Sequence, residues 1–538
     1  MGARALLGLL GLLGAGCEPV LPQADADTGG DSTPPSVGDT DEPVDTGPPA
    51  PCGFTSTAPP GDLVEGDLVT FTVGCSLSAL DAVELSVLGL PPSAGFDPGT
   101  GVFEWQTNGA DAGPVDLTFS APAADGPPET LVVSLYIHND EDAPGDRPPD
   151  PASYRTEFGL PVVHIDARGS LSESYVEADI TLDGETVTGS AKVRGASSTA
   201  YPKKSYTLDF GGDELGVADW GERTRGHLYL LSTFDDNSYV RQKLVFDTWA
   251  AMAEAQGAQR LTPRSFFTVV YLNGDYLGLY LGVDRMDDEY IRHMGFSGEG
   301  DLYKSINHDA NYRRVDARGR EKGDLATGWE KKEGADESDF DPLRALMAFA
   351  SAANPATLAA EGGEWVDLQE FMDWQILVTW TQSEDSAGKN AYLYRDDETG
   401  LFRFSPWDFN ASYGQNWYTL RHPATYIHDF SYRNYIFEMT RAEPTLRAEM
   451  RARFAALSAP GGPLTAEWQL GTLDAYTDRI EAAATRDWAR WGAEYERFDR
   501  WASPRDAAGD WNDYEGERAY LERWVTDREA EMADWMAE

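Results

Sequence analysis

Two aspartates and one asparagine have residue types and a spacing suited to chemistry on a phosphate group. Asp385 is followed five residues later by Asn390, in the stretch Asp385-Ser-Ala-Gly-Lys-Asn390. Asp408 follows a stretch of β-forming residues, in Phe404-Ser-Pro-Trp-Asp-Phe-Asn410. Phosphoryl transfer depends on positioning and on charge neutralisation, so one carboxylate must face the attacking hydroxyl and another must face a metal.

The five-residue offset is also that of the catalytic loop of protein kinases, H-R-D-x-x-x-x-N. There the aspartate accepts the proton of the substrate hydroxyl and the asparagine holds a metal ion. A second aspartate follows a strand in those enzymes and chelates the Mg²⁺ that bridges the nucleotide phosphates. The pattern therefore predicts Asp385 as the catalytic residue, with Asn390 and Asp408 as metal ligands.

A Gly- and Ser-rich turn further upstream offers cations for the phosphates. It runs from Arg194-Gly-Ala-Ser-Ser to Pro-Lys203-Lys204-Ser-Tyr, between two predicted strands. Successive strand side chains point to opposite faces, so only one of the two lysines can face a cleft, and the sequence leaves open which one. Arg194 offers a second phosphate contact. On its own, the segment is more typical of a basic hairpin on an acidic protein.

Taken together, these segments resemble the CotH kinase family, over about residues 155–500. The motifs that carry the resemblance are Arg194-Gly-x-Ser-Ser, Pro202-Lys-Lys-Ser-Tyr206, Asp236-Asn-Ser238 with Arg241, Leu272-Asn-Gly-Asp-Tyr-Leu-Gly-Leu-Tyr280 with Asp284-Arg285, Asp301-Leu-Tyr-Lys304, Asp385 to Asn390 and Pro406-Trp-Asp408. The resemblance implies a divergent protein-kinase-like fold and transfer of phosphate from ATP, with Mg²⁺ or Mn²⁺, to Ser or Thr of surface or secreted proteins. It also implies that Asp385 is the catalytic aspartate, that Asp408 and Asn390 bind the metal, and that the pair Lys203 and Lys204 contacts the nucleotide.

The composition excludes several other classes of function. The 538 residues carry 43 basic and 91 acidic side chains, for a formal net charge of −48. Such a surface repels nucleic acid, whose binding needs clustered Lys and Arg, and it favours cations and basic protein partners. Histidine is scarce, and no H-E-x-x-H, C-x-x-C or G-x-S-x-G motif occurs, so zinc and serine-triad chemistry have no support.

The first residues predict export. A positive start and a short apolar run precede Cys17, which is typical of a bacterial lipoprotein signal over residues 1–17, with Cys17 lipidated. An ordinary secretory signal is the alternative. We expect an anchor in the cell envelope, at the outer membrane or the cell surface, and an acidic linker, rich in Pro and Gly, over residues 18–51.

Short β-forming runs separated by turn residues predict an Ig- or cadherin-like β-sandwich over residues 52–138. Its role is that of a spacer or of a module that binds Ca²⁺ or sugar. Cys52 and Cys75 either form a disulfide in an oxidising compartment or stay unpaired in the core. Residues 139–154, rich in Pro and Asp, predict a second linker.

The remaining chain predicts an α+β domain over residues 155–434 with a helical part over 435–538. The many tryptophans of this tail belong either to the core or to a sugar-binding face. Two alternatives to a kinase stay open: a non-catalytic kinase-like scaffold or adhesion module of the envelope, and a hydrolase that uses paired carboxylates.

Overall fold

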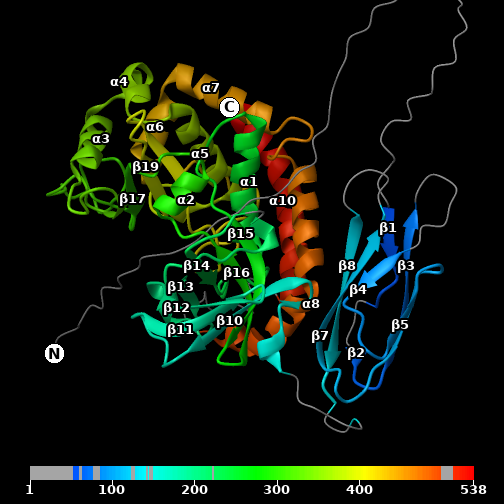
Figure 1. Ribbon diagram of the computed structural model, residues 1–538. Coiled ribbons are helices and arrows are strands. Elements are labelled where there is room, and N and C mark those ends of the chain that lie inside the picture. The colour runs from blue at the N-terminus through cyan, green and yellow to red at the C-terminus, as the bar shows by residue number, and fades with distance from the viewer. Residues whose placement is uncertain are drawn as a thin grey trace, which may run out of the picture. The chain divides into compact units, whose positions relative to one another are not determined.

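The computed structural model describes residues 53–59, 63–76, 85–122, 128–140, 143, 150–220, 223–498 and 513–537 (Figure 1). The chain forms two compact units, which divide between Gly159 and Leu160. Cys17, the linker over residues 18–51 and Cys52 lie outside the described residues. Among the helices of the described ranges, none combines the length and the apolar character that a membrane span requires.

The first unit is built from strands in two four-stranded sheets, of order β1-β3-β6-β5 and β2-β8-β7-β4. The strands are β1 (Gly53–Ser56), β2 (Leu63–Val64), β3 (Leu68–Ser76), β4 (Ser86–Leu88), β5 (Ala94–Asp97), β6 (Val102–Gln106), β7 (Gly113–Ala121) and β8 (Glu129–His138), followed by β9 (Thr156–Glu157). Alternation buries Phe103 and Trp105 of β6 against residues of the other sheet, so both sheets share one apolar core. Cys75 is disulfide-bonded.

A barrel-like sheet opens the second unit. Its strands are β10 (Leu160–Ala167), β11 (Val176–Leu182), β12 (Glu185–Arg194), β13 (Ser205–Asp209), β14 (His227–Leu231), β15 (Ser265–Leu272) and β16 (Asp275–Val283). They follow the order β11-β12-β13-β14-β16-β15-β10, and β11 also pairs with β10, so the sheet curls back on itself. Inward-facing apolar side chains from nearly every strand fill its interior.

A second, antiparallel sheet of order β18-β17-β19-β20 lies among helices (Figure 1). Its strands are β17 (Asp301–Ser305), β18 (Trp329–Glu333), β19 (Ala391–Arg395) and β20 (Phe402–Pro406). The helices are α1 (Arg241–Ala255), α2 (Asp288–His293), α3 (Asp341–Ala352), α4 (Pro355–Glu361), α5 (Leu368–Thr381), α6 (Tyr435–Ala442), α7 (Pro444–Leu457), α8 (Ala466–Arg497) and α10 (Tyr514–Ala537). The mixed α+β class is therefore confirmed.

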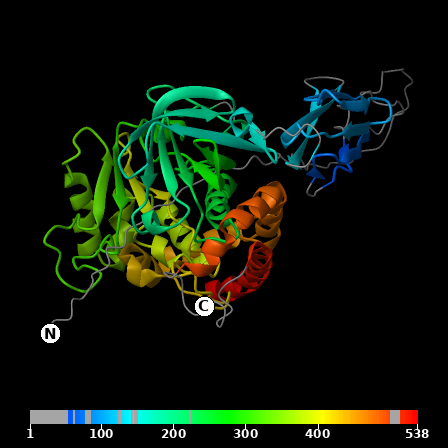
Figure 2. The same ribbon diagram turned by 90° about the horizontal axis from the view of Figure 1, so that it is seen from below.

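The helical tail packs back on both parts of this unit. Figures 1 and 2 show α8 and α10 side by side, and α8 also lies along β16. Leu473 and Ile480 of α8 are fully buried, as their helical spacing indicates. Trp491 and Trp524 are buried too, which places these two tryptophans in the core.

Candidate functional site

One cavity of about 320 Å³ brings together the three residues that the sequence singles out, Asp385, Asn390 and Asp408. Asp385 lies in a 3₁₀ turn (Glu384–Ser386) just after α5. Asn390 directly precedes β19, and Asp408 follows β20. Because Ala391 pairs with Pro406 across this antiparallel hairpin, the residues before β19 and after β20 emerge at the same edge of the sheet.

Asn390 and Asp408 both have left-handed backbone conformations, with φ of 58° and 62°. Asn and Asp tolerate this region better than most residues, and such conformations cluster at functional sites. The two side chains are thereby turned out of the hairpin and into the cavity.

Both oxygens of Asp385 have cationic or hydrogen-bonding partners. Lys389 Nζ lies 2.8 Å from one oxygen, and His308 Nε2 lies 3.3 Å from the other. Burial opposes ionisation of Asp385, but the hydrogen bond from His308 and the charge of Lys389 outweigh it and lower the pKa of Asp385 to about 2. The carboxylate is therefore ionised at neutral pH and can accept a hydrogen bond from a hydroxyl.

A third carboxylate, Asp235, lines the same cavity. Tyr201 Oη lies 3.3 Å from its Oδ2, which also accepts a hydrogen bond from the Asn410 amide. Burial and the neighbouring Asp236 raise the pKa of Asp235 to about 6. Burial and the nearby Asp235 charge likewise raise the pKa of Asp408 above its usual range. The crowded negative charge would be relieved by a cation in the cavity.

The residues present fit a divalent metal ion. The side-chain oxygen of Asn390 is buried and accepts no hydrogen bond from the described residues. An amide oxygen beside the carboxylates of Asp408 and Asp235 forms the all-oxygen ligand set that Mg²⁺ and Mn²⁺ prefer. Asp235 precedes the Asp236-Asn-Ser238 motif, and that proximity was the only sequence signal for it.

Arg194 lies in a smaller adjoining cavity of about 50 Å³, which shares Asp235 with the larger one. Its guanidinium stacks on the ring of Tyr229 at 3.5 Å, and its buried Nη1 has no hydrogen-bond partner in the described part of the chain. The next residue, Gly195, has φ of +129°, and an added Cβ would lie 2.1 Å from Ser198 Oγ. Glycine is therefore required where this turn bends toward the cavity.

The structure does not bring Lys203 or Lys204 to either cavity. Lys203 is fully buried, and its Nζ lies 2.6 Å from Asp487 Oδ1 on α8 and 2.6 Å from the Leu279 carbonyl. Lys204, which directly precedes β13, donates to the carbonyls of Thr199 at 2.9 Å and Tyr201. One lysine thus joins the sheet to the tail, and the other fastens the turn that lines the cavity.

Lys304 on β17 is a cation near the site that residue types alone did not single out, although it ends the Asp301-Leu-Tyr-Lys304 motif. Its side chain is buried, with Nζ 5.4 Å from the Trp407 ring, and it forms no ion pair with a carboxylate of the described residues. Burial and the Arg194 charge lower the pKa of Lys304, whereas the Asp408 charge raises it. A buried cation without a paired anion is costly, so this position favours an anionic ligand.

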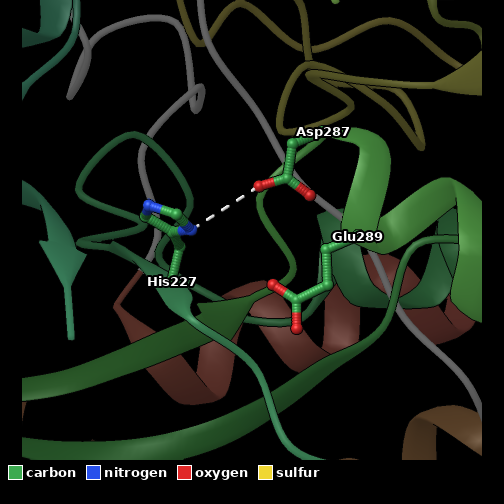
Figure 3. Close-up of side chains that lie close together, drawn as sticks. All are labelled: His227, Asp287 and Glu289. Carbon is green, nitrogen blue, oxygen red and sulfur yellow. Dashed lines mark ion pairs between the residues drawn. The ribbon is translucent and has the colours of Figure 1, made fainter. Parts of the chain in front are cut away.

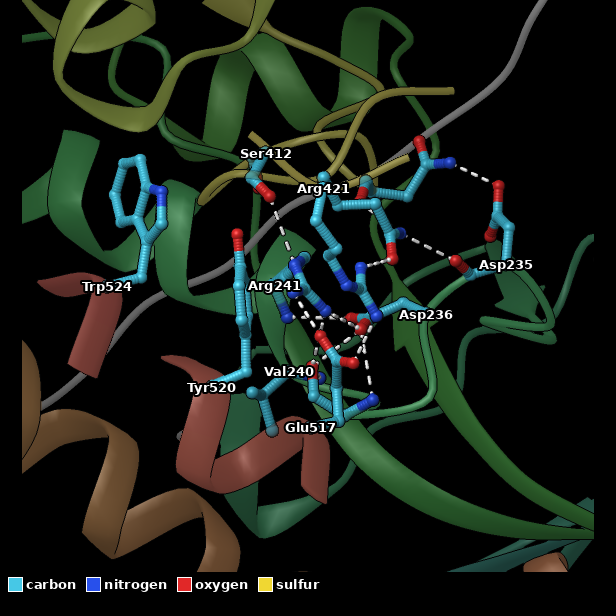
Figure 4. Close-up of polar contacts among 12 residues, drawn as sticks. Asp235, Asp236, Val240, Arg241, Ser412, Arg421, Glu517, Tyr520 and Trp524 are labelled. Atoms are coloured by element: carbon cyan, nitrogen blue, oxygen red, sulfur yellow. Dashed lines mark hydrogen bonds and ion pairs between the residues drawn. The ribbon is translucent and has the colours of Figure 1, made fainter. Parts of the chain in front are cut away.

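The segment after Asp408 is held in place by a buried ionic network (Figure 4). Arg241 donates to the Ser412 carbonyl at 3.0 Å, pairs with Asp236 at 2.7 Å and also pairs with Glu517 of α10. Arg421 pairs with the other oxygen of Glu517. One glutamate of the tail thus joins two arginines that flank the cavity segment.

Close backbone approach reinforces this attachment. Gly414 has φ of +80°, and an added Cβ would lie 2.1 Å from Tyr520 Oη and 2.4 Å from Trp524 Nε1. The same two side chains donate to the His422 carbonyl at 3.0 and 3.1 Å. The C-terminal helix therefore fixes the inner side of this segment.

A separate group of possible metal ligands, His227, Asp287 and Glu289, shares no residue with the cavity (Figure 3). Its ligand atoms lie within 4.8 Å of one another, and His227 Nδ1 lies 3.7 Å from Asp287 Oδ2. The two acids already have local partners, because Asp287 caps α2 and Glu289 accepts the Gly226 amide at 3.1 Å. These contacts account for the group as a link between β14 and α2.

Comparison with known proteins agrees with the motifs that build the cavity. The family model described as CotH kinase protein matches residues 191–532, which include every residue of the site. The chain is 28% identical over 235 residues to the inner spore coat protein H of Bacillus subtilis (strain 168). The matched residues make up 44% of this chain and 61% of that protein. This chain thus spans about three fifths of that relative's length. The chain belongs to the CotH kinase protein family.

Proposed function

We propose that this protein is an atypical protein kinase that transfers the γ-phosphate of ATP to a Ser or Thr hydroxyl of a surface or secreted protein. The single observation that carries the proposal is the meeting of Asp385, Asn390 and Asp408 in one cavity. Family membership supports it, since the match includes all three residues. The loops that line this cavity follow strands of the barrel-like sheet and of the second sheet, and this arrangement supports a kinase-like fold.

In this proposal, Asp385 orients the acceptor hydroxyl. Because its pKa lies near 2, Asp385 stays ionised and accepts the hydroxyl hydrogen bond, while Lys389 and His308 hold the carboxylate in one orientation. The hydroxyl oxygen bonds to the γ-phosphorus, the bond from that phosphorus to the β–γ bridging oxygen breaks, and ADP leaves. The hydroxyl proton passes through Asp385 to solvent.

Asn390 and Asp408 would hold a divalent metal, with Asp235 as a further oxygen ligand. A bound Mg²⁺ or Mn²⁺ would supply charge neutralisation for the phosphates. Arg194 and Lys304 are buried cations that both lie over the ring of Trp407, the neighbour of Asp408, and neither has an ion pair with a carboxylate of the described residues. We assign phosphate contacts to these two side chains, and a structural role to Lys203 and Lys204.

The test is transfer of labelled γ-phosphate from ATP by the full chain, with a generic basic protein as acceptor. Wild type should label the acceptor, and Asp385→Asn should lose transfer while ATP binding is retained, because its contact acts chiefly in the transition state. The exposed Asp341→Asn is the matched control, since Asp341 on α3 lines neither cavity and, among the described residues, forms its ion pair with Arg344. Transfer at the wild-type rate by Asp385→Asn would refute this assignment.

We further propose that the protein is an exported lipoprotein. The apolar run before Cys17 supports this proposal, as does the disulfide at Cys75, because disulfides persist in oxidising compartments. The two sheets around one core support an Ig- or cadherin-like sandwich that acts as a spacer.

A further inference from the structure

The segment between Asp408 and α6 exposes a group of large apolar side chains beside the cavity. We call this group the aromatic patch; it consists of Trp417, Tyr418, Leu420, Tyr426 and Tyr432. Each is between 37% and 48% exposed. Among the described residues of the second unit, Tyr175 is the other large apolar residue in this class. An exposed apolar patch of this kind marks an interaction site.

The patch is exposed on a segment that is well anchored on its other side. Arg528 of α10 donates to the carbonyls of Ala424 and Tyr426, the latter at 3.0 Å. Tyr520 and Trp524 hold the His422 carbonyl. The side chains therefore stay exposed although their backbone is fixed, which favours a partner surface over a poorly packed loop.

The patch is continuous with the proposed phosphate-transfer cavity. Trp417 belongs to the patch and also lines the cavity that contains Asp385. Tyr432 donates a hydrogen bond of 2.5 Å to Glu384, the neighbour of Asp385, and Arg433 lines the cavity. A polypeptide that presents its hydroxyl to Asp385 would therefore lie next to Trp417 and Tyr432 of the patch.

The charges beside the patch are already paired within the protein. Arg433 pairs with Glu384, Arg421 with Glu517, and Asp429 with Arg441 at 3.4 Å. In a chain of net charge −48, the described residues of this surface thus offer rings and an apolar side chain, and the three carboxylates named above are paired. Its complement is an uncharged, apolar polypeptide stretch.

We infer that the aromatic patch docks the acceptor protein, by binding apolar or aromatic residues that flank the phosphorylated Ser or Thr. The inference rests on the proposed kinase function and names the substrate feature that this site recognises. Extended peptides bound in this way gain affinity from side-chain pockets and rings along the groove.

The experiment measures binding of two dye-labelled peptides to the full chain by fluorescence anisotropy. Both carry one central Ser; Phe and Leu flank it in the first, and Asn replaces these in the second. We expect at least about tenfold tighter binding of the first peptide, from burial of its apolar side chains. The variant Tyr418→Ser/Leu420→Ser/Tyr426→Ser should remove that difference.

Two further proteins control the comparison. The single variant Tyr418→Ser tests the patch with less risk to folding, and it should weaken binding of the first peptide only. Leu88→Ser removes a side chain that is 76% exposed on the first unit, and it should bind both peptides as wild type does. Thermal unfolding verifies that each variant is folded.

Equal binding of the two peptides by wild type, or unchanged discrimination by the folded variants, would overturn the inference. So would a change in oligomeric state of the variants by sedimentation, since the patch would then join two copies of the chain. ATP binding is measured separately. Peptide discrimination without ATP binding contradicts the kinase proposal alone, and ATP binding without discrimination contradicts the docking surface alone.

Discussion

Substitution of Lys203 tests whether this lysine stabilises the fold or binds nucleotide. The side chains of Lys203 and Asp487 are both 0% exposed, and their charged atoms lie 2.6 Å apart. Asp487 also accepts hydrogen bonds from the Leu279 amide at 2.8 Å and the Tyr495 hydroxyl at 2.9 Å. Removing one partner leaves the other as a buried, uncompensated charge, so we expect Lys203→Met to lower the free energy of unfolding by about 3–5 kcal/mol.

A double-mutant cycle separates the interaction energy of the Lys203–Asp487 pair from other effects of each substitution on stability. Asp487→Asn keeps an acceptor for the Leu279 amide and should also cost about 3–5 kcal/mol. The double variant should lose less than the sum of the two single losses, by about 2 kcal/mol, because neither charge is then left alone. Arg168→Met breaks exposed pairs with Glu177 and Asp179 and should leave the free energy of unfolding close to that of wild type.

The assays are urea unfolding of the full chain and calorimetric titration with ATP and Mg²⁺. We expect the folded Lys203→Met variant to bind ATP as wild type does, because the Nζ of Lys203 is fully buried against Asp487 and the Leu279 carbonyl. Wild-type stability combined with weakened ATP binding would refute this reasoning and return Lys203 to the nucleotide site.

Three further predictions concern other parts of the chain. Burial raises the pKa of Glu370 from 4.5 to about 8, so its contribution to stability is complete below pH 4.5 and is lost as pH rises toward 8. Glu370→Gln should flatten the pH dependence of the unfolding free energy in this window by up to about 1.4 kcal/mol per pH unit, and identical pH profiles would exclude this role. Lys304→Met should weaken ATP binding at least about tenfold through loss of a charge-assisted contact, whereas Arg344→Met, which breaks an exposed pair, should not; equal affinities would remove Lys304 from the site. Cys17→Ser should move the protein from the membrane fraction to the soluble fraction, and unchanged partitioning would contradict lipid anchoring.

The sequence predicted the elements that depend on local pattern. The two strands predicted on either side of the Gly/Ser turn are β12 and β13. Asp385, Asn390 and Asp408 meet in one cavity because a single hairpin separates the last two and a short turn separates the first two. Local spacing was therefore enough to predict the three central residues of the site.

Contacts between segments that are distant along the chain could not be predicted from the sequence. Lys203 and Asp487 are 284 residues apart, so nothing in the Lys-Lys pair indicated which lysine is buried. His308 reaches Asp385 from the loop after β17, without a motif of its own. Glu517 of α10 pairs with Arg241. Amphipathic spacing predicts that this segment is a helix, but it does not predict which residue the helix contacts. These positions depend on tertiary packing, which alternation and periodicity do not encode.

The central claim is that the cavity binds ATP through a divalent metal held by Asp408 and Asn390. Isothermal titration of the full chain with ATP, with and without Mg²⁺ or Mn²⁺, tests it most directly. We predict metal-dependent ATP binding by wild type, at least about tenfold weaker binding by Asp408→Asn, and wild-type binding by Asp385→Asn. A folded wild-type protein that shows no metal-dependent ATP binding would contradict the proposed function.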